Sequence, residues 1–153
     1  MKNWRKVHRY VALATLLPMM LIAITGVILQ MRNQFEFIQP ATIKNTLPAD
    51  AKFLDLGTIS KQFGHENIEQ IILKPGKGSL VVRLLDGHEV QLHPVTGEIL
   101  KKAMRRTNFF IELHQGSFFG NIGQYGIFFL TGLGLCFLIV SGIVIYPFKR
   151  KRS

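Results

Sequence analysis

The sequence predicts a membrane α-helical protein in which two transmembrane helices flank a small inserted α+β domain, a helix on a short antiparallel sheet. The chain has two long uncharged runs, 19 residues over 11–29 and 34 residues over 115–148. About 20 apolar residues are enough to span a hydrocarbon core. The sequence between the two runs is polar and amphipathic, and it is long enough for one small folded module.

Lysine and arginine are concentrated beside these two runs. Of the 19 cations in a chain of net charge +10, eight flank the runs: Lys2, Arg5, Lys6, Arg9, Lys149, Arg150, Lys151 and Arg152. Such charges mark the cytoplasmic ends of membrane helices. We therefore expect a multi-pass protein of the bacterial inner membrane with both termini cytoplasmic and the central domain periplasmic. The charge implies a lipid bilayer as partner and no nucleic acid.

The first run predicts an uncleaved anchor rather than a signal peptide. It is longer than the apolar core of a typical signal peptide, and no small-residue cleavage site follows it. We expect a helix from Trp4 to Arg32 with a kink at Pro18, and Thr25 followed by Gly26 gives it a small face near the outer leaflet.

The second run is too long for one perpendicular span, because 34 residues of helix measure about 50 Å. Part of it should therefore lie along the membrane interface. The resulting boundaries are a tail at 1–10, a first span at 11–31, a periplasmic domain with its connections at 32–106, an interfacial segment at 107–122, a second span at 123–146 and a tail at 147–153.

Turn and capping residues predict the elements of the central domain. Asp55 can cap a short helix that ends at Gly64, with Leu56, Ile59 and Phe63 on one face. Alternating patterns then predict strands at 68–73, 80–85 and 88–93, the last two joined by an Asp86-Gly87 hairpin, and a last edge strand that begins with Glu98-Ile99-Leu100. One face of this sheet should be buried by the helix, and the other should stay available.

Glycines and cations near the second run allow two interpretations each. Gly116 and Gly120 form a GxxxG pattern, typical of helix pairing or of close approach by a flat ligand. The basic residues Lys101, Lys102, Arg105 and Arg106 could face lipid headgroups or could clamp an anionic group such as cofactor propionates.

The sequence contains no Gly-rich phosphate loop, serine-nucleophile motif, CxxC or HExxH. The residues that stand out chemically are His8, at the start of the first helix, and His114, at the start of the second uncharged run. Histidine at a membrane edge is a candidate metal ligand. The simpler alternative is an interfacial or capping residue that binds no metal.

The stretch from Arg5-Lys6-Val7-His8-Arg9-Tyr10 to Ile24-Thr25-Gly26 resembles the opening of the PepSY-associated transmembrane helix family. Leu113-His114-Gln115-Gly116, with Gly120, Gly123 and Ser141-Gly142, resembles that family's second signature. Leu84-Leu85-Asp86-Gly87 and His93-Pro94-Val95-Thr96-Gly97-Glu98 are similar to a PepSY-domain hairpin. The resemblance covers nearly the whole chain.

This resemblance implies a periplasmic PepSY module on inner-membrane helices. Larger relatives include iron-siderophore reductases that hold haem b between their helices, and by carry-over His8 and His114 would be axial ligands. Those relatives have at least four transmembrane helices, whereas this chain has two, so a haem-holding bundle would need a homodimer or a membrane partner subunit. His8 and His114 lie at opposite membrane faces, so each would pair with its counterpart in a second protomer.

Two functions follow from different readings of these features. The first is an electron-transfer subunit of iron or siderophore-reductase type, served by a separate redox donor protein; if it is an enzyme, it is an oxidoreductase, a ferric or flavoprotein reductase subunit. The alternative is a non-catalytic, membrane-tethered PepSY module that binds a periplasmic peptide, peptidase or complex partner. A transmembrane sensor ranks last, because the predicted tails are too short for a folded effector domain.

Overall fold

The computed structural model describes residues 2–48 and 50–146 of the chain. The terminal cluster Lys149 to Arg152 lies outside the described residues. The chain folds as two compact units: the described parts of Met1–Gln30 and Phe109–Ser153 form a helical unit, and Met31–Asn108 form a sheet unit.

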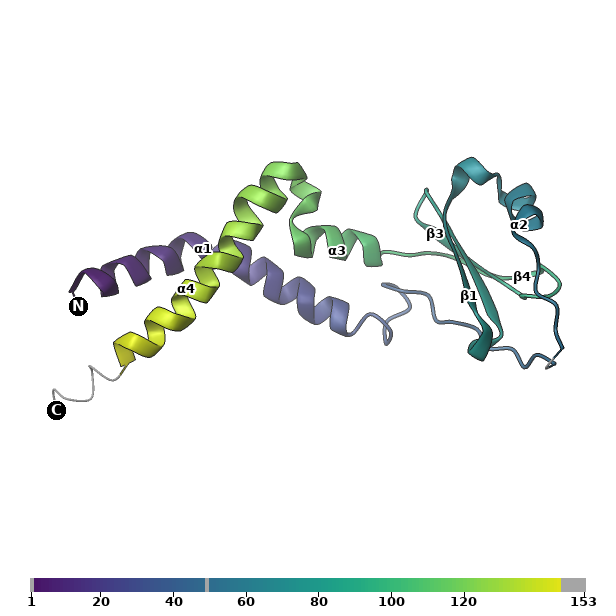
Figure 1. Cartoon of the computed structure of the whole chain (residues 1–153), viewed down its shortest axis with the longest axis horizontal. Coiled ribbons are helices and arrows are strands. Elements are labelled where there is room, and N and C mark those ends of the chain that lie inside the picture. Colours follow the sequence, from purple (N-terminus) through teal and green to yellow (C-terminus); the bar gives the residue numbers. More distant parts are fainter. Residues whose placement is uncertain (1, 49, 147–153) are drawn as a thin grey trace. The chain divides into compact units, whose positions relative to one another are not determined.

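The helical unit contains two helices that are long and apolar enough to cross a membrane, Asn3–Gln30 and Ile122–Ile145. Helix α1 (Lys2–Gln30) continues through Pro18 and bends near its middle (Figure 1). It is followed in this unit by α3 (Thr107–Gln115), the 3-10 turn η3 (Ser117–Phe119), the π-helical turn η4 (Ile122–Phe128) and α4 (Phe129–Ile145).

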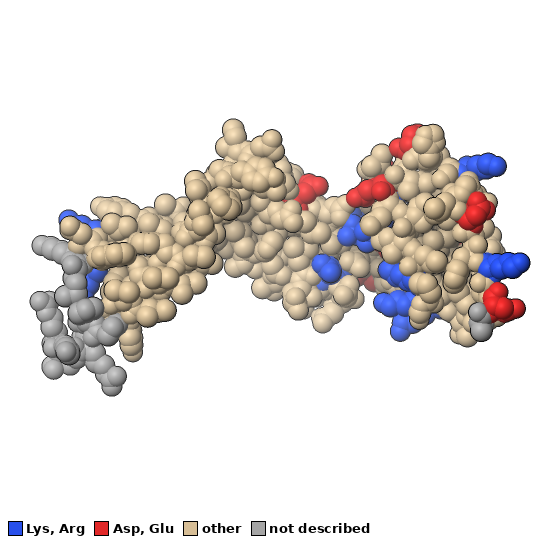
Figure 2. Space-filling model, viewed as in Figure 1, with Lys and Arg blue, Asp and Glu red and all other residues tan. Residues whose placement is uncertain are grey.

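Helices α1 and α4 pack closely because small residues lie between them. Thr15 is buried on α1, and a methyl group added to Gly134 of α4 would lie 2.7 Å from its Cγ2 atom. The rings of Trp4 and Phe137 stack at 5.9 Å between their centroids. Figure 2 shows that the visible face of the long helices is uncharged apart from cations near the N-terminus of α1.

The interpretation of Gly116 and Gly120 as a helical GxxxG motif is wrong. Gly116 has φ 77° and Gly120 has φ 71°, backbone conformations that interrupt a helix rather than continue it. Gly116 ends α3 and lies against the ring of Phe128, so its missing side chain makes room for that ring. Both glycines are needed to turn the chain between α3 and the second long helix.

The sheet unit is a four-stranded antiparallel sheet of order β1-β2-β3-β4. Its elements are α2 (Leu56–Phe63), the 3-10 turn η1 (His65–Asn67), β1 (Ile68–Lys74), the 3-10 turn η2 (Pro75–Lys77), β2 (Ser79–Leu84), β3 (His88–Leu92) and β4 (Ile99–Met104). Gly87 has φ 85° in the predicted hairpin. The predicted last edge strand is confirmed: it begins at Ile99, and its pairing with β3 continues to Met104, so that Lys101 and Lys102 lie on the strand.

One sheet face carries the hydrophobic core. Ile59 of α2 packs against alternating residues of β2 and β3, and the buried cluster is Ile59, Leu80, Val82, Leu84, Val90 and Leu92. A core of this size stabilises a small domain only modestly, because the stabilisation is proportional to the apolar area removed from water.

The prediction that the other face stays available is wrong over β3. Glu89 is 3% exposed and Gln91 is fully buried. The irregular segment before α2 covers them: the Gln91 side chain donates to Ala41 O at 2.8 Å and accepts from the Ile43 amide at 2.8 Å. These paired bonds dock the segment on the sheet as an additional layer.

Candidate functional site

His8 lies in the first turns of α1 and contacts the end of α4. Its Nδ1 atom lies 2.7 Å from Ser141 Oγ, and that hydroxyl lies 2.7 Å from Phe137 O, one turn back on α4. Ser141 is 1% exposed, whereas His8 is half-buried.

His114 has the same arrangement at the other end of α1. Its Nδ1 atom lies 3.0 Å from Thr25 Oγ1, which lies 2.7 Å from Leu21 O. Thr25 is 2% exposed, and His114 is half-buried near the end of α3.

These contacts assign the imidazole protons. An oxygen–oxygen distance of 2.7 Å between a hydroxyl and a carbonyl needs a proton between them, and a hydroxyl has only one. The hydroxyl of Ser141 or Thr25 therefore donates to the carbonyl of its own helix and accepts from the imidazole Nδ1–H. In the neutral ring this leaves the lone pair on Nε2, the tautomer in which histidine binds a metal.

A glycine follows each hydroxyl and lies beside each imidazole. A Cβ atom built on Gly26 would lie 3.3 Å from Cε1 of His114, and one on Gly142 would lie 3.9 Å from Cε1 of His8. Each of the two histidines thus has a hydroxyl group and a glycine as neighbours. Thr25 follows His8 by 17 positions on α1, which places the two histidine sites about 25 Å apart along the helix.

A cavity of about 300 Å³ adjoins His8. It is lined by Arg5, His8, Gly142, Ile145 and Tyr146. It therefore combines one imidazole, one guanidinium and apolar walls, which are the groups needed to hold a flat apolar ligand with a carboxylate at its edge. The sequence singled out Thr25-Gly26 and Ser141-Gly142 as family signatures but did not show that each pair lies against a histidine of the other helix, and it did not single out Arg5.

The chemistry of these groups fits the axial ligation of haem. In the described part of the chain no three His, Cys, Asp or Glu side chains cluster as a metal site. Each site instead offers one imidazole, which is what one chain contributes to a bis-histidine haem shared by two chains.

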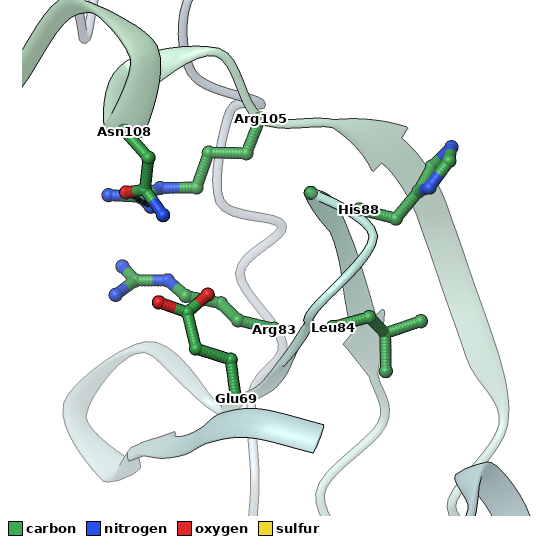
Figure 3. A pocket seen from close by; sticks show the side chains of 7 residues that line it. Glu69, Arg83, Leu84, His88, Arg105 and Asn108 are labelled. Atoms are coloured by element: carbon green, nitrogen blue, oxygen red, sulfur yellow. Dashed lines mark hydrogen bonds between the residues drawn. The ribbon is translucent and has the colours of Figure 1, made fainter. Parts of the chain in front are cut away.

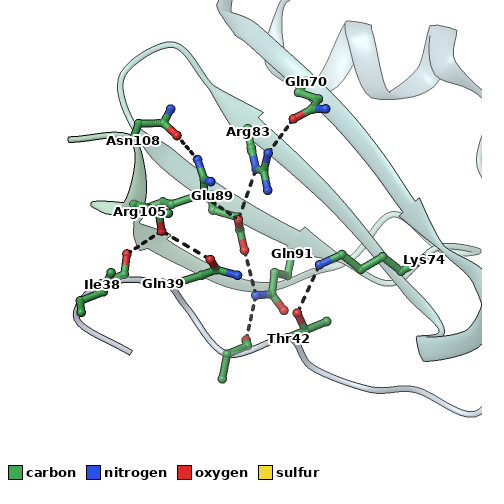
Figure 4. A network of polar contacts seen from close by, with 12 residues as sticks. Ile38, Gln39, Thr42, Gln70, Lys74, Arg83, Glu89, Gln91, Arg105 and Asn108 are labelled. Atoms are coloured by element: carbon green, nitrogen blue, oxygen red, sulfur yellow. Dashed lines mark hydrogen bonds and ion pairs between the residues drawn. The ribbon is translucent and has the colours of Figure 1, made fainter. Parts of the chain in front are cut away.

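Arg105 and Arg106 have partners within the sheet unit. Arg105 Nε lies 3.8 Å from Glu89 Oε2, and its guanidinium also donates to Asn108 (Figure 4). Burial lowers the pKa of Arg105. Arg106 lies 4.1 Å over the ring of Phe37 and donates to Phe37 O. That either arginine binds an anionic cofactor group stays a prediction.

A small hollow lies between Arg83 and Arg105, lined also by Glu69 and Asn108 (Figure 3). Its volume is about 10 Å³, which is the space of a single water molecule. It is therefore too small for a cofactor, and its arginines act on Glu89: the Nε atoms of Arg83 and Arg105 lie 3.6 and 3.8 Å from the same carboxylate oxygen.

Comparison with protein families decides what kind of protein carries these features. A family model described as "PepSY-associated TM region" matches residues 2–150. The chain belongs to this family. A search of curated proteins finds no match. The family match and the two apolar helices together make the chain a membrane-associated PepSY protein whose environment is a lipid bilayer, and the four-stranded unit is its inserted α+β domain.

Proposed function

We propose that this PepSY protein is a transmembrane electron-transfer subunit of the bacterial inner membrane that holds haem b at His8 and His114. The observation that carries the proposal is the repeated environment of the two histidines. In each, the imidazole Nδ1 bonds a buried hydroxyl of a neighbouring helix, and a glycine lies beside Cε1 of the ring.

The residues divide the task between them. His8 and His114 would be axial ligands, and Ser141 and Thr25 hold their rings in the ligating tautomer. Arg5 lines the cavity beside His8 and is placed to pair with a propionate. The haem, when bound, supplies one-electron redox chemistry.

Two chains are required for this arrangement, because one chain presents a single imidazole at each end of α1. In a homodimer, one His8 pair and one His114 pair would make two sites near opposite membrane faces; a membrane partner subunit could supply the second ligands instead. The basic start of α1 supports a topology in which the His8 site is on the cytoplasmic side and the sheet unit is in the periplasm. Electrons would come from a separate donor protein, and the acceptor would be a ferric complex or a flavoprotein.

A reduced-minus-oxidised visible spectrum of the protein, purified from cells supplied with haem, tests this proposal. We expect b-type bands that weaken in His8→Ala and in His114→Ala. His65→Ala is the matched control, because His65 is highly exposed, its side chain being 88% accessible, and lies in the sheet unit. A folded protein without b-type bands would contradict the proposal and favour the tethered binding module.

A further inference from the structure

A second cavity lies wholly within the sheet unit and has a different character. Its volume is about 320 Å³, and its polar lining consists of Asn33, Gln39, Thr42, Lys44, Lys74 and Lys77. Three lysines and no carboxylate face this space. The His8 cavity, by contrast, has mainly apolar walls and one cation.

The backbone fixes the walls of this lysine cavity. Lys74 ends β1 and Lys77 lies in the turn that follows it. The facing wall, residues 39–44, is held by the bonds to Gln91 and by Asn45, whose amide donates to Lys77 O at 3.0 Å and whose side chain donates to Gly78 O at 2.8 Å. Gly78 has φ 55°, and the Asn45 carbonyl occupies the space that a Cβ atom would fill. The lysines are therefore brought together by the fold.

The cavity has an excess of positive charge. Within the described residues, no carboxylate oxygen lies within 4 Å of Lys44, Lys74 or Lys77. Lys74 is half-buried, and among the described residues its ammonium has one hydrogen-bond partner, Thr42 Oγ1 at 3.3 Å (Figure 4). The nearby acid, Glu89, already faces Arg83 and Arg105.

The pKa of Lys74 is lowered from its ordinary value, which agrees with the excess of positive charge around the cavity. Burial lowers the pKa of Lys74 most, Glu89 raises it, and Lys77, Arg83 and Arg105 lower it further. A half-buried ammonium whose nearest carboxylate is paired with other cations is stabilised by an added anion, because the anion offsets the hydration that burial removed.

We propose that the lysine cavity binds a phosphate group. Ammonium groups bind phosphate as point charges, and the side chains of Asn33, Gln39 and Thr42 add hydrogen-bond donors. The phosphate belongs either to an anionic lipid headgroup or to a soluble phosphate.

The test uses the full chain in a neutral detergent, titrated with dihexanoylphosphatidylglycerol, with dihexanoylphosphatidylcholine or with inorganic phosphate. The variant is Lys44→Gln/Lys74→Gln/Lys77→Gln, and the matched control is Lys52→Gln/Lys61→Gln/Lys102→Gln, which removes the same number of cations at exposed positions outside the cavity. Within the part of the chain that the structure describes, none of the three cavity lysines has an ion pair to lose, so circular dichroism should show that the variant is folded.

We expect the wild type and the control to bind dihexanoylphosphatidylglycerol or inorganic phosphate at least tenfold more tightly than the cavity variant does. Preference for the anionic lipid over both phosphatidylcholine and inorganic phosphate identifies a headgroup site. Equal binding of inorganic phosphate identifies a site for soluble phosphates. Equal affinities of the cavity variant and the control, or no binding by the wild type, would overturn the proposal.

Discussion

The buried hydroxyl groups of Ser141 and Thr25 do more than bond the backbone of their own helices. A serine or threonine in an apolar helix commonly bonds the carbonyl one turn back, and Ser141 and Thr25 do so. Each of them also accepts a bond from an imidazole of the other helix. The orientation of His8 and His114 therefore depends on Ser141 and Thr25, which would not be metal ligands themselves.

The first prediction concerns Ser141→Ala, in a His114→Ala background that leaves only the His8 site. Loss of the hydroxyl frees the imidazole to rotate and to change tautomer, so haem affinity at this site should fall about 10- to 100-fold. Haem titration followed by absorbance measures it. Ser141→Thr keeps a hydroxyl and is the control; equal affinities of the two variants would show that the bond is irrelevant to ligation.

The second prediction concerns Glu89→Gln in the sheet unit. Glu89 is 3% exposed and lies opposite Arg83 and Arg105, so its neutralisation leaves two partly buried cations without a counter-charge. We expect a loss of about 3 kcal/mol in the free energy of unfolding, measured by denaturant titration with circular dichroism. Glu98→Gln, at an exposed position, should be close to neutral, and a similar small effect at Glu89 would refute this account of the network.

At the scale of elements, local signals in the sequence predict most of the fold. The uncharged runs predict both long helices, and Asp86-Gly87 with its flanking alternation predicts the β2–β3 hairpin. The signals fail where structure depends on distant partners. The end of β4 depends on pairing with β3, and the covered polar face depends on Gln91 binding a segment about 50 positions earlier.

The GxxxG interpretation failed for a related reason. Spacing alone does not distinguish glycines that face a partner helix from glycines that end a helix. The positive φ values of Gly116 and Gly120 show that these two glycines interrupt the helix. At the candidate site, the sequence predicts both histidines but not their hydroxyl partners, because those contacts join positions 89 and 133 residues apart.

The third prediction concerns the N-terminus of α2. Asp55 accepts bonds from the amide and hydroxyl of Thr58, at 3.0 and 2.6 Å, and these bonds lower its pKa from 3.8. The folded-state pKa lies below the unfolded one, so the cap stabilises fully above the unfolded pKa, and this stabilisation is lost as pH falls through the folded pKa.

Asp55→Asn keeps a good capping residue but cannot titrate. The melting-temperature difference between wild type and Asp55→Asn should therefore shrink or reverse as pH falls below about 4. Thermal melts in detergent across this range measure it, with Asp50→Asn as the control for an exposed carboxylate outside the helix. A difference that does not change with pH would show that the Asp55 charge does not contribute.

At the scale of the whole molecule, the fourth prediction is the topology. In a Cys136→Ser parent, Lys61→Cys reports on the sheet unit and Lys6→Cys on the start of α1. We expect a membrane-impermeant maleimide to label Lys61→Cys in intact cells and Lys6→Cys only after permeabilisation, because the basic flank stays cytoplasmic. The reverse pattern would place the sheet unit in the cytoplasm.

The two-helix architecture makes assembly part of the function. Within the described residues, one chain has an imidazole near each end of α1 and no second imidazole beside either, so the proposed electron transfer through haem would require at least two chains. In a homodimer with one haem between the two His8 side chains and another between the two His114 side chains, the ratio is one haem per chain.

The haem-to-protein ratio of purified wild type and variants tests this central claim most directly. A pyridine haemochrome assay with quantitative amino-acid analysis should find about one haem per chain in the wild type, about half in His8→Ala and in His114→Ala, and none in the double variant. An unchanged ratio in the double variant, or complete loss in either single variant, would contradict two independent sites at opposite ends of α1.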